Sequence, residues 1–176
     1  MIRLSRALLF SFAAAAAAAA AAAVAMPRTA SAQSASSSQR GQPKTPFGVA
    51  DFAKLRWLEG SWAATATDEK PFYARYHFTN DSTMDITYFR DSAFTQQSSA
   101  GRVYLTVGRV YHTFGSGRWG ATNVDASGAF FIPQVNAHNT FAWSYESPNA
   151  WTLTQRSGLS GHDRVTVYHM QRVGSR

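Results

Sequence analysis

His112 and His138 are the residues of this sequence best suited by type and setting to bind a polar group or transfer a proton. His112 lies in the stretch VYHTFG, where Val110 and Phe114 share its side of an alternating pattern, so we expect it to point inward. His138 follows Asn136 in FIPQVNAHNTF, an irregular stretch rich in amides. Such a loop at the mouth of a fold either hydrogen-bonds a ligand or satisfies only its own backbone.

The sequence contains none of the motifs that mark common catalytic sites. It has no G-x-S-x-G, no H-E-x-x-H and no glycine-rich phosphate loop before a helix. Asp85 is the one acid in a strongly alternating run, opposite Met84 and Ile86, which predicts a solvent-facing carboxylate rather than a general base. The sequence therefore favours a protein without catalysis. A small-molecule isomerase or hydrolase that uses His112, His138 or Asp85 is the alternative.

Aromatic side chains supply a second set of candidate binding residues. They fall on the apolar side of alternating runs such as PFYARYHF and STMDITYF. Facing inward together, such side chains either fill a barrel or line a cavity that holds one small hydrophobic molecule, and both outcomes stay open. The aromatic residues selected as ligand contacts are Tyr76, Tyr88, Phe141 and Trp143.

Composition narrows the classes of partner and cofactor. The chain has no cysteine, which excludes disulfides, thiol nucleophiles and cysteine metal ligands, and no metal site is predicted. Its 17 basic residues are scattered singly, so we expect no nucleic-acid-binding surface. A small hydrophobic ligand is the predicted partner, and the sequence does not indicate an oligomeric state.

The candidate residues lie on ten short runs of alternating apolar and polar residues. Turns of Gly, Ser, Asn, Asp and Pro separate the runs and leave no room for crossover helices, so neighbouring runs must pair antiparallel. Closure of about eight to ten such strands into an up-and-down barrel removes exposed edges. We therefore predict an all-β antiparallel barrel with a short N-terminal helix; a two-sheet β-sandwich is the alternative. The predicted strands are 62–67, 71–78, 82–89, 102–107, 110–114, 118–124, 129–133, 140–145, 151–156 and 164–173.

The stretch LRWLEGSW, residues 55–62, joins the predicted helix to the first predicted strand. The helix is expected over 51–59, because Phe52, Leu55 and Leu58 fall on one helical face, with Asp51 as its N-cap and Gly60 as its end. A short helix of this kind can cover one end of a barrel.

The triplet GSW at residues 60–62 resembles the G-x-W signature of the lipocalins and the calycin superfamily. The longer LRWLEGSW resembles the L-x-W-L-x-G-x-W opening of bacterial exported lipocalin-like families of unknown function. The resemblance implies that Trp62 plugs one end of the barrel and packs over a basic residue from near the last strand, either Arg172 or Arg164. Trp57 and Gly60 would belong to the same closure. It implies no particular ligand.

The chain also resembles the nitrobindin-type barrels, which bind haem through a histidine late in the chain. His169 is the position that could serve, on one face with Val165 and Val167. The opening departs from the nitrobindin pattern, with Ala64 and Ala66 where glycines would stand. We therefore expect a histidine at the rim or among apolar neighbours and no cofactor, and we keep haem as an alternative.

The first 32 residues have the pattern of a Sec-type secretory signal peptide. Arg3 and Arg6 precede an alanine-rich run, and Ala30 and Ala32 form a cleavage motif. The uncharged run is nearly long enough to span a bilayer, so an uncleaved anchor is the alternative. We predict a signal peptide over 1–32, a flexible linker over 33–46, the barrel over 47–173 and a tail over 174–176. The mature protein, periplasmic or secreted, would have no stable membrane insertion, and losing three arginines lowers its net charge from +7 to +4.

Overall fold

The computed structural model describes residues 46–158 and 164–174. The predicted signal peptide and nearly all of the predicted linker lie outside these residues, as does most of the last predicted turn. Within them, no helix is long and apolar enough to cross a membrane. The described chain forms helix α1 (Val49–Ala53), the 3-10 helix η1 (Arg56–Leu58) and the strands β1 (Gly60–Thr65), β2 (Phe72–Asn80), β3 (Thr83–Phe89), β4 (Gln97–Thr106), β5 (Arg109–Phe114), β6 (Gly117–Asp125), β7 (Gly128–Val135), β8 (Asn139–Ser147), β9 (Ala150–Ser157) and β10 (Arg164–Arg172).

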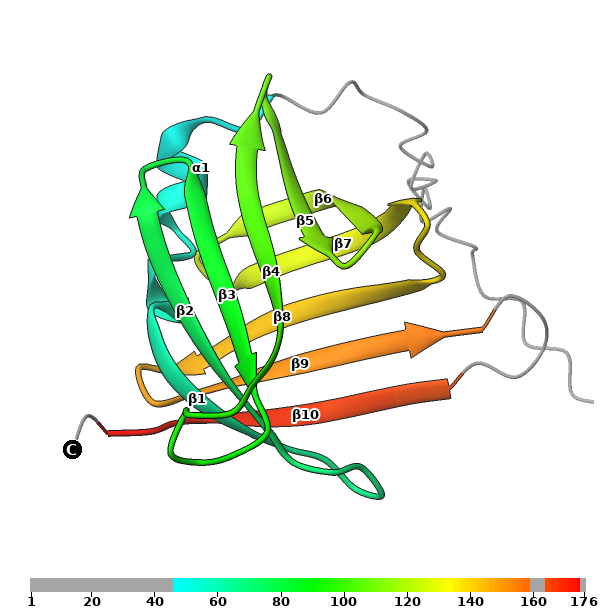
Figure 1. Ribbon diagram of the computed structural model, residues 1–176. Coiled ribbons are helices and arrows are strands. Elements are labelled where there is room, and N and C mark those ends of the chain that lie inside the picture. The colour runs from blue at the N-terminus through cyan, green and yellow to red at the C-terminus, as the bar shows by residue number, and fades with distance from the viewer. Residues whose placement is uncertain (1–45, 159–163, 175–176) are drawn as a thin grey trace, which may run out of the picture. The chain divides into compact units, whose positions relative to one another are not determined.

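The strands form one closed antiparallel barrel in which each strand pairs with its neighbours in the sequence (Figure 1). The barrel closes where β1 pairs with both β10 and β2: Trp62 lies opposite Arg172 on one side and Ala74 on the other. Each of the ten described strands pairs on both sides, and this removal of exposed edges is the physical reason for which the sequence predicts closure. The predicted up-and-down barrel is confirmed, and the two-sheet sandwich is not favoured.

The alternating pattern of the sequence decides which side chains enter the barrel. In β2, Ala74, Tyr76 and Phe78 are buried, whereas Arg75 and His77 between them are exposed. Successive side chains of a strand point to opposite faces of the sheet, so one register places a whole aromatic row inside. The other strands follow the same rule around the barrel.

The N-terminal helix is shorter than the sequence predicts and begins earlier. Gly48 is the N-cap, so the prediction of Asp51 as the cap is wrong. Asp51 lies in the first turn, where its carboxylate accepts a hydrogen bond from the backbone N–H of Gly48 at 2.9 Å. The helix ends at Ala53, and the chain continues into η1 instead of one continuous helix.

Helix α1 and η1 cover one end of the barrel (Figure 1). Phe52, Leu55 and Leu58 are fully buried in the core. The ring of Phe52 packs edge-on against Phe78 near the end of β2, with 5.6 Å between ring centroids. These contacts close this end of the barrel with apolar side chains.

Trp62 of β1 packs at this closed end, next to Leu58, and is fully buried. Its Nε1 donates a hydrogen bond to the carbonyl of Leu58 at 2.7 Å, which satisfies the indole nitrogen. The guanidinium carbon of Arg172 lies 4.2 Å from the centre of a Trp62 ring, a cation–π arrangement. The side chain that covers Trp62 therefore comes from the last strand, as the resemblance implies.

Arg172 also ties the two ends of the described chain together through backbone carbonyls. Its guanidinium donates to Glu59 at 2.7 Å, to Trp57 at 3.1 Å and to Pro148 at 2.7 Å. Gly60 has φ of +122°, and a Cβ there would collide with the Arg172 guanidinium. Glycine at position 60 thus leaves the space in which Arg172 makes its contacts.

Candidate functional site

A cavity of about 380 Å³ opens at the end of the barrel opposite α1. Its wall comes from the beginning of β2, the end of β3, the beginning of β4 and the facing ends of β5, β6, β8 and β9. We call it the luminal cavity. Its lining residues are Phe72, Tyr76, Tyr88, Ser98, Ser99, His112, Phe114, Trp119, Asn139, Phe141, Trp143, Leu153 and Gln155.

His112 is a nearly fully buried polar residue of this wall, at 5 % exposed. It lies in β5, where Val110 and His112 are buried while Tyr111 and Thr113, which alternate with them, are only partly buried, so His112 points inward. Its imidazole is surrounded by the rings of Trp119, Phe131, Phe141 and Trp143, with centroids 5.5, 6.1, 5.2 and 5.9 Å away. The Nδ1 atom is buried and has no hydrogen-bond partner among the described residues. The site therefore holds an unused polar group within an aromatic enclosure.

Burial keeps the His112 ring uncharged. It lowers the pKa of His112 from its ordinary value of 6.5 to about 3, because the aromatic surroundings cannot solvate an imidazolium. Below pH 6.5 the unfolded chain binds a proton at this residue and the folded chain does not, so the free energy of unfolding must fall as the pH drops. We expect His112 alone to lower it by about 2 kcal/mol between pH 7 and pH 5.

Chemical unfolding of the wild type and of His112→Phe at both pH values measures this effect. The phenylalanine ring fills the same aromatic enclosure without a titrating group, so the variant should lose about 2 kcal/mol of the pH dependence. Other titrating residues contribute equally to both proteins and cancel in the comparison. Equal pH dependence in the two proteins would show that His112 is solvated in the folded state.

Tyr76 and Tyr88 bring two phenol groups to the luminal cavity. Burial raises the pKa of both tyrosines above the ordinary value of 10.0, and each is also affected by the other phenol. Both groups are therefore uncharged at neutral pH. Tyr76 packs edge-on against Trp143 and Trp151, with centroids 6.2 and 5.7 Å away, so its ring is held in place.

Phe141 and Trp143 reach the cavity from β8. Their rings are nearly fully buried and both pack against Phe131 of β7, which is stacked on Phe141 with centroids 4.7 Å apart. Together with Tyr76, Tyr88 and His112, they are the sequence-predicted ligand contacts that the structure brings into one cavity.

Comparisons with known proteins do not assign this chain to a family. No protein-family model and no curated protein matches the chain. Interpretation of the site therefore rests on its own residues.

The loop between β7 and β8 does not supply the ligand contacts that the sequence suggests. Asn136 and His138 are exposed and are not part of the cavity wall. Asn136 instead adopts φ of +48°, a left-handed conformation that asparagine tolerates better than most residues, so its role is in the turn. Asn139 lines the cavity in their place, and its carbonyl accepts a hydrogen bond from Trp119 Nε1 at 2.9 Å.

Two further candidates lie on the outer face of the barrel. Asp85 forms an ion pair with Arg102 on the adjacent strand, 2.6 Å apart, so the structure does not bring it to His112 or His138. His169 does share a face with Val165 and Val167, but all three are exposed to solvent. No group of three or more His, Cys, Asp and Glu in the described part of the chain could hold a metal ion.

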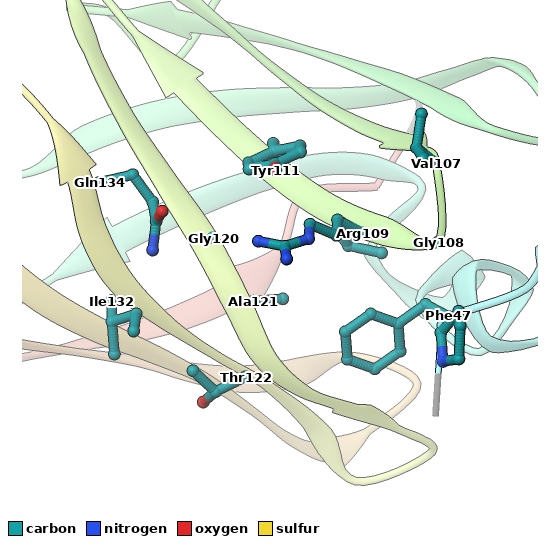
Figure 2. Close-up of a pocket in the computed structure, with 12 residues that line it drawn as sticks. Phe47, Val107, Gly108, Arg109, Tyr111, Gly120, Ala121, Thr122, Ile132 and Gln134 are labelled. Atoms are coloured by element: carbon teal, nitrogen blue, oxygen red, sulfur yellow. The ribbon is translucent and has the colours of Figure 1, made fainter. Parts of the chain in front are cut away.

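A second hollow, of about 490 Å³, is a groove on the outer surface of the barrel. Figure 2 shows Arg109 and Tyr111 of β5 on one side and Ile132 and Gln134 of β7 on the other, across Gly120 of β6. None of the residues selected from the sequence lines it. The luminal cavity, which gathers five of the seven predicted ligand contacts, is therefore the candidate site.

Sequence reasoning missed several wall residues, among them Trp119, Ser99 and Gln155. Gln155 could have been found, because it alternates with Trp151 and Leu153 in the same strand. Ser99 could not, because QSSAG has no apolar alternation and becomes strand only by pairing with β3, where Ser99 lies opposite Tyr88.

Proposed function

We propose that this chain is an exported, lipocalin-like barrel that binds one small, mainly apolar molecule in its luminal cavity. The observation that carries the proposal is an aromatic cavity of 380 Å³, closed at one end by α1 and open at the other. Pockets for small molecules fall at about 300 to 1,000 Å³ and have mostly apolar walls with a few polar groups. The cavity has this size and composition.

The lipocalin-like part of the proposal is supported by the closed antiparallel barrel and by Trp62 under Arg172 at its sealed end. Export is supported by the signal-peptide pattern of residues 1–32, which would place the protein in the periplasm or outside the cell. In that location it would act as a carrier or as an envelope accessory protein.

Titration with N-phenylnaphthylamine, an uncharged apolar dye that fluoresces strongly in apolar surroundings, tests the proposal. We expect saturable binding of one dye per chain with a dissociation constant in the micromolar range. The dye should also raise the melting temperature, because it binds the folded state only.

Ser99→Trp is the variant that locates the binding site. Ser99 is paired with Tyr88 and faces the lumen, so an indole there occupies the cavity and should weaken dye binding at least about tenfold. Ala100→Trp is the matched control, because the next residue of the strand is exposed and faces outward, and it should bind as the wild type does. A dye that fails to bind the wild type, or that binds both variants equally, would refute the proposed function.

A further inference from the structure

Among the residues that the structure describes, no charged side chain lines the luminal cavity. Of its thirteen lining residues none is Lys, Arg, Asp or Glu, and its histidine is held uncharged by burial. Arginines are close in sequence, but they point away: Arg118 precedes Trp119, Arg156 follows Gln155, and both are exposed on the outer face. A carboxylate that entered the cavity would meet no cation from the described wall.

The polar groups of the wall are matched to an uncharged partner. A neutral imidazole carries one hydrogen-bond donor and one acceptor, and a phenol offers both functions as well. His112 has an unpaired nitrogen, and Tyr76 and Tyr88 add two hydroxyl groups to the same cavity. A hydroxyl group can donate to an imidazole nitrogen or accept from it and can do the same with a phenol, so it matches these groups in either tautomer of His112.

The shape of the enclosure favours a flat molecule. Rings of Trp119, Phe141 and Trp143 surround His112 at 5.2 to 5.9 Å, and they meet its ring at interplanar angles of 61° to 86°. Edge-to-face contacts of this kind are the preferred packing of aromatic rings. An aromatic ligand could extend the same packing toward the open end.

On the basis of the binding function proposed above, we propose that the luminal cavity selects uncharged, planar aromatic molecules that carry a hydroxyl group and rejects carboxylates of the same size. A carboxylate would lose its hydration without gaining a cationic partner, which costs several kcal/mol for a buried charge. The loss of hydration costs a hydroxyl group far less free energy, and a hydrogen bond to the wall compensates for that cost.

Calorimetric titration of the wild type with naphthol and with naphthoate of the same ring position tests the selection. At neutral pH naphthol is uncharged and naphthoate is an anion, while the ring is the same. We expect naphthol to bind at least about tenfold more tightly. Naphthoate that binds as tightly as naphthol overturns the selection. If N-phenylnaphthylamine binds, that failure leaves the proposed function intact; if none of the three molecules binds, both fail.

Adding a cation to the wall should reverse the preference. Ser99→Lys places an ammonium group at the lumen, and we expect naphthoate affinity to rise about tenfold while naphthol affinity falls or stays level. Ala100→Lys adds the same charge one residue away on the outer face and should change neither affinity. Equal gains in the two variants would mean that naphthoate binds outside the cavity and would overturn the proposal.

His112→Phe tests the hydrogen-bonding group. The wild type should bind naphthol more tightly than naphthalene by about fivefold to tenfold, the effect of one hydrogen bond. In the variant this preference should fall by at least half on a logarithmic scale, while naphthalene still binds. An unchanged preference would mean that His112 does not bind the hydroxyl group, which would then pair with Tyr76 or Tyr88. The ratio of naphthol affinity to naphthalene affinity in Tyr88→Phe tests this second assignment.

Discussion

Replacing Trp62 with alanine is expected to lower the free energy of unfolding by about 3 to 5 kcal/mol, the usual cost of truncating a fully buried tryptophan. The indole is 0 % exposed, and its removal leaves a cavity beneath η1. It also removes the hydrogen bond to Leu58 and the aromatic face under Arg172. Denaturant unfolding of both proteins at one pH measures the difference.

Trp57→Ala is the matched control for this prediction, because Trp57 comes from the same segment but is only half-buried. It packs edge-on against Tyr145 and Trp151, with centroids 5.4 and 5.8 Å away, and its Nε1 has no hydrogen-bond partner among the described residues. We expect Trp57→Ala to lower the free energy of unfolding by about 1 to 2 kcal/mol. Trp62→Ala that is no more destabilising than Trp57→Ala would contradict the role of Trp62 as the plug of the closed end.

The barrel can be predicted from the sequence because the features that determine it involve residues close together in the chain. Alternation places Tyr76 and Phe78 on one face of a strand, and short turns allow only antiparallel pairing between neighbours. The same alternation correctly turns His112 inward. Alternation and turn length each depend on a few adjacent residues, so both can be recognised in a single sequence.

The placement of the polar wall residues depends on pairing between strands, so it cannot be predicted from the pattern of one strand alone. Ser99 enters the cavity because β4 extends back to Gln97 along β3, although its residues show no apolar pattern. His169 alternates as regularly as His112, yet it lies on the outer face. The sequence gives the period of a strand, while the register with neighbouring strands and the closure of the barrel decide which face is inside.

Gly128→Ala is expected to be as destabilising as the loss of Trp62, and it should also disturb the luminal cavity. Gly128 begins β7 with φ of +149°, a conformation that residues with a Cβ rarely adopt. A Cβ there would collide with the backbone carbonyl of Trp143 in β8, and the backbone has no alternative rotamer by which to move away. Backbone strain and overpacking together should lower the free energy of unfolding by about 3 to 5 kcal/mol.

Gly115→Ala separates these two causes. Gly115 also has positive φ, at +57°, but a Cβ there would meet nothing within 4 Å, so only the cost of the backbone conformation, about 1 to 2 kcal/mol, is expected. Because β8 carries Trp143 and Phe141, Gly128→Ala should also weaken binding of N-phenylnaphthylamine at a temperature where the variant is folded. Equal stability of the two alanine variants would mean that β7 and β8 do not approach as closely as their pairing requires. The wall of the luminal cavity depends on that approach, because Gly128 is what allows β8 to hold Trp143 against Phe131.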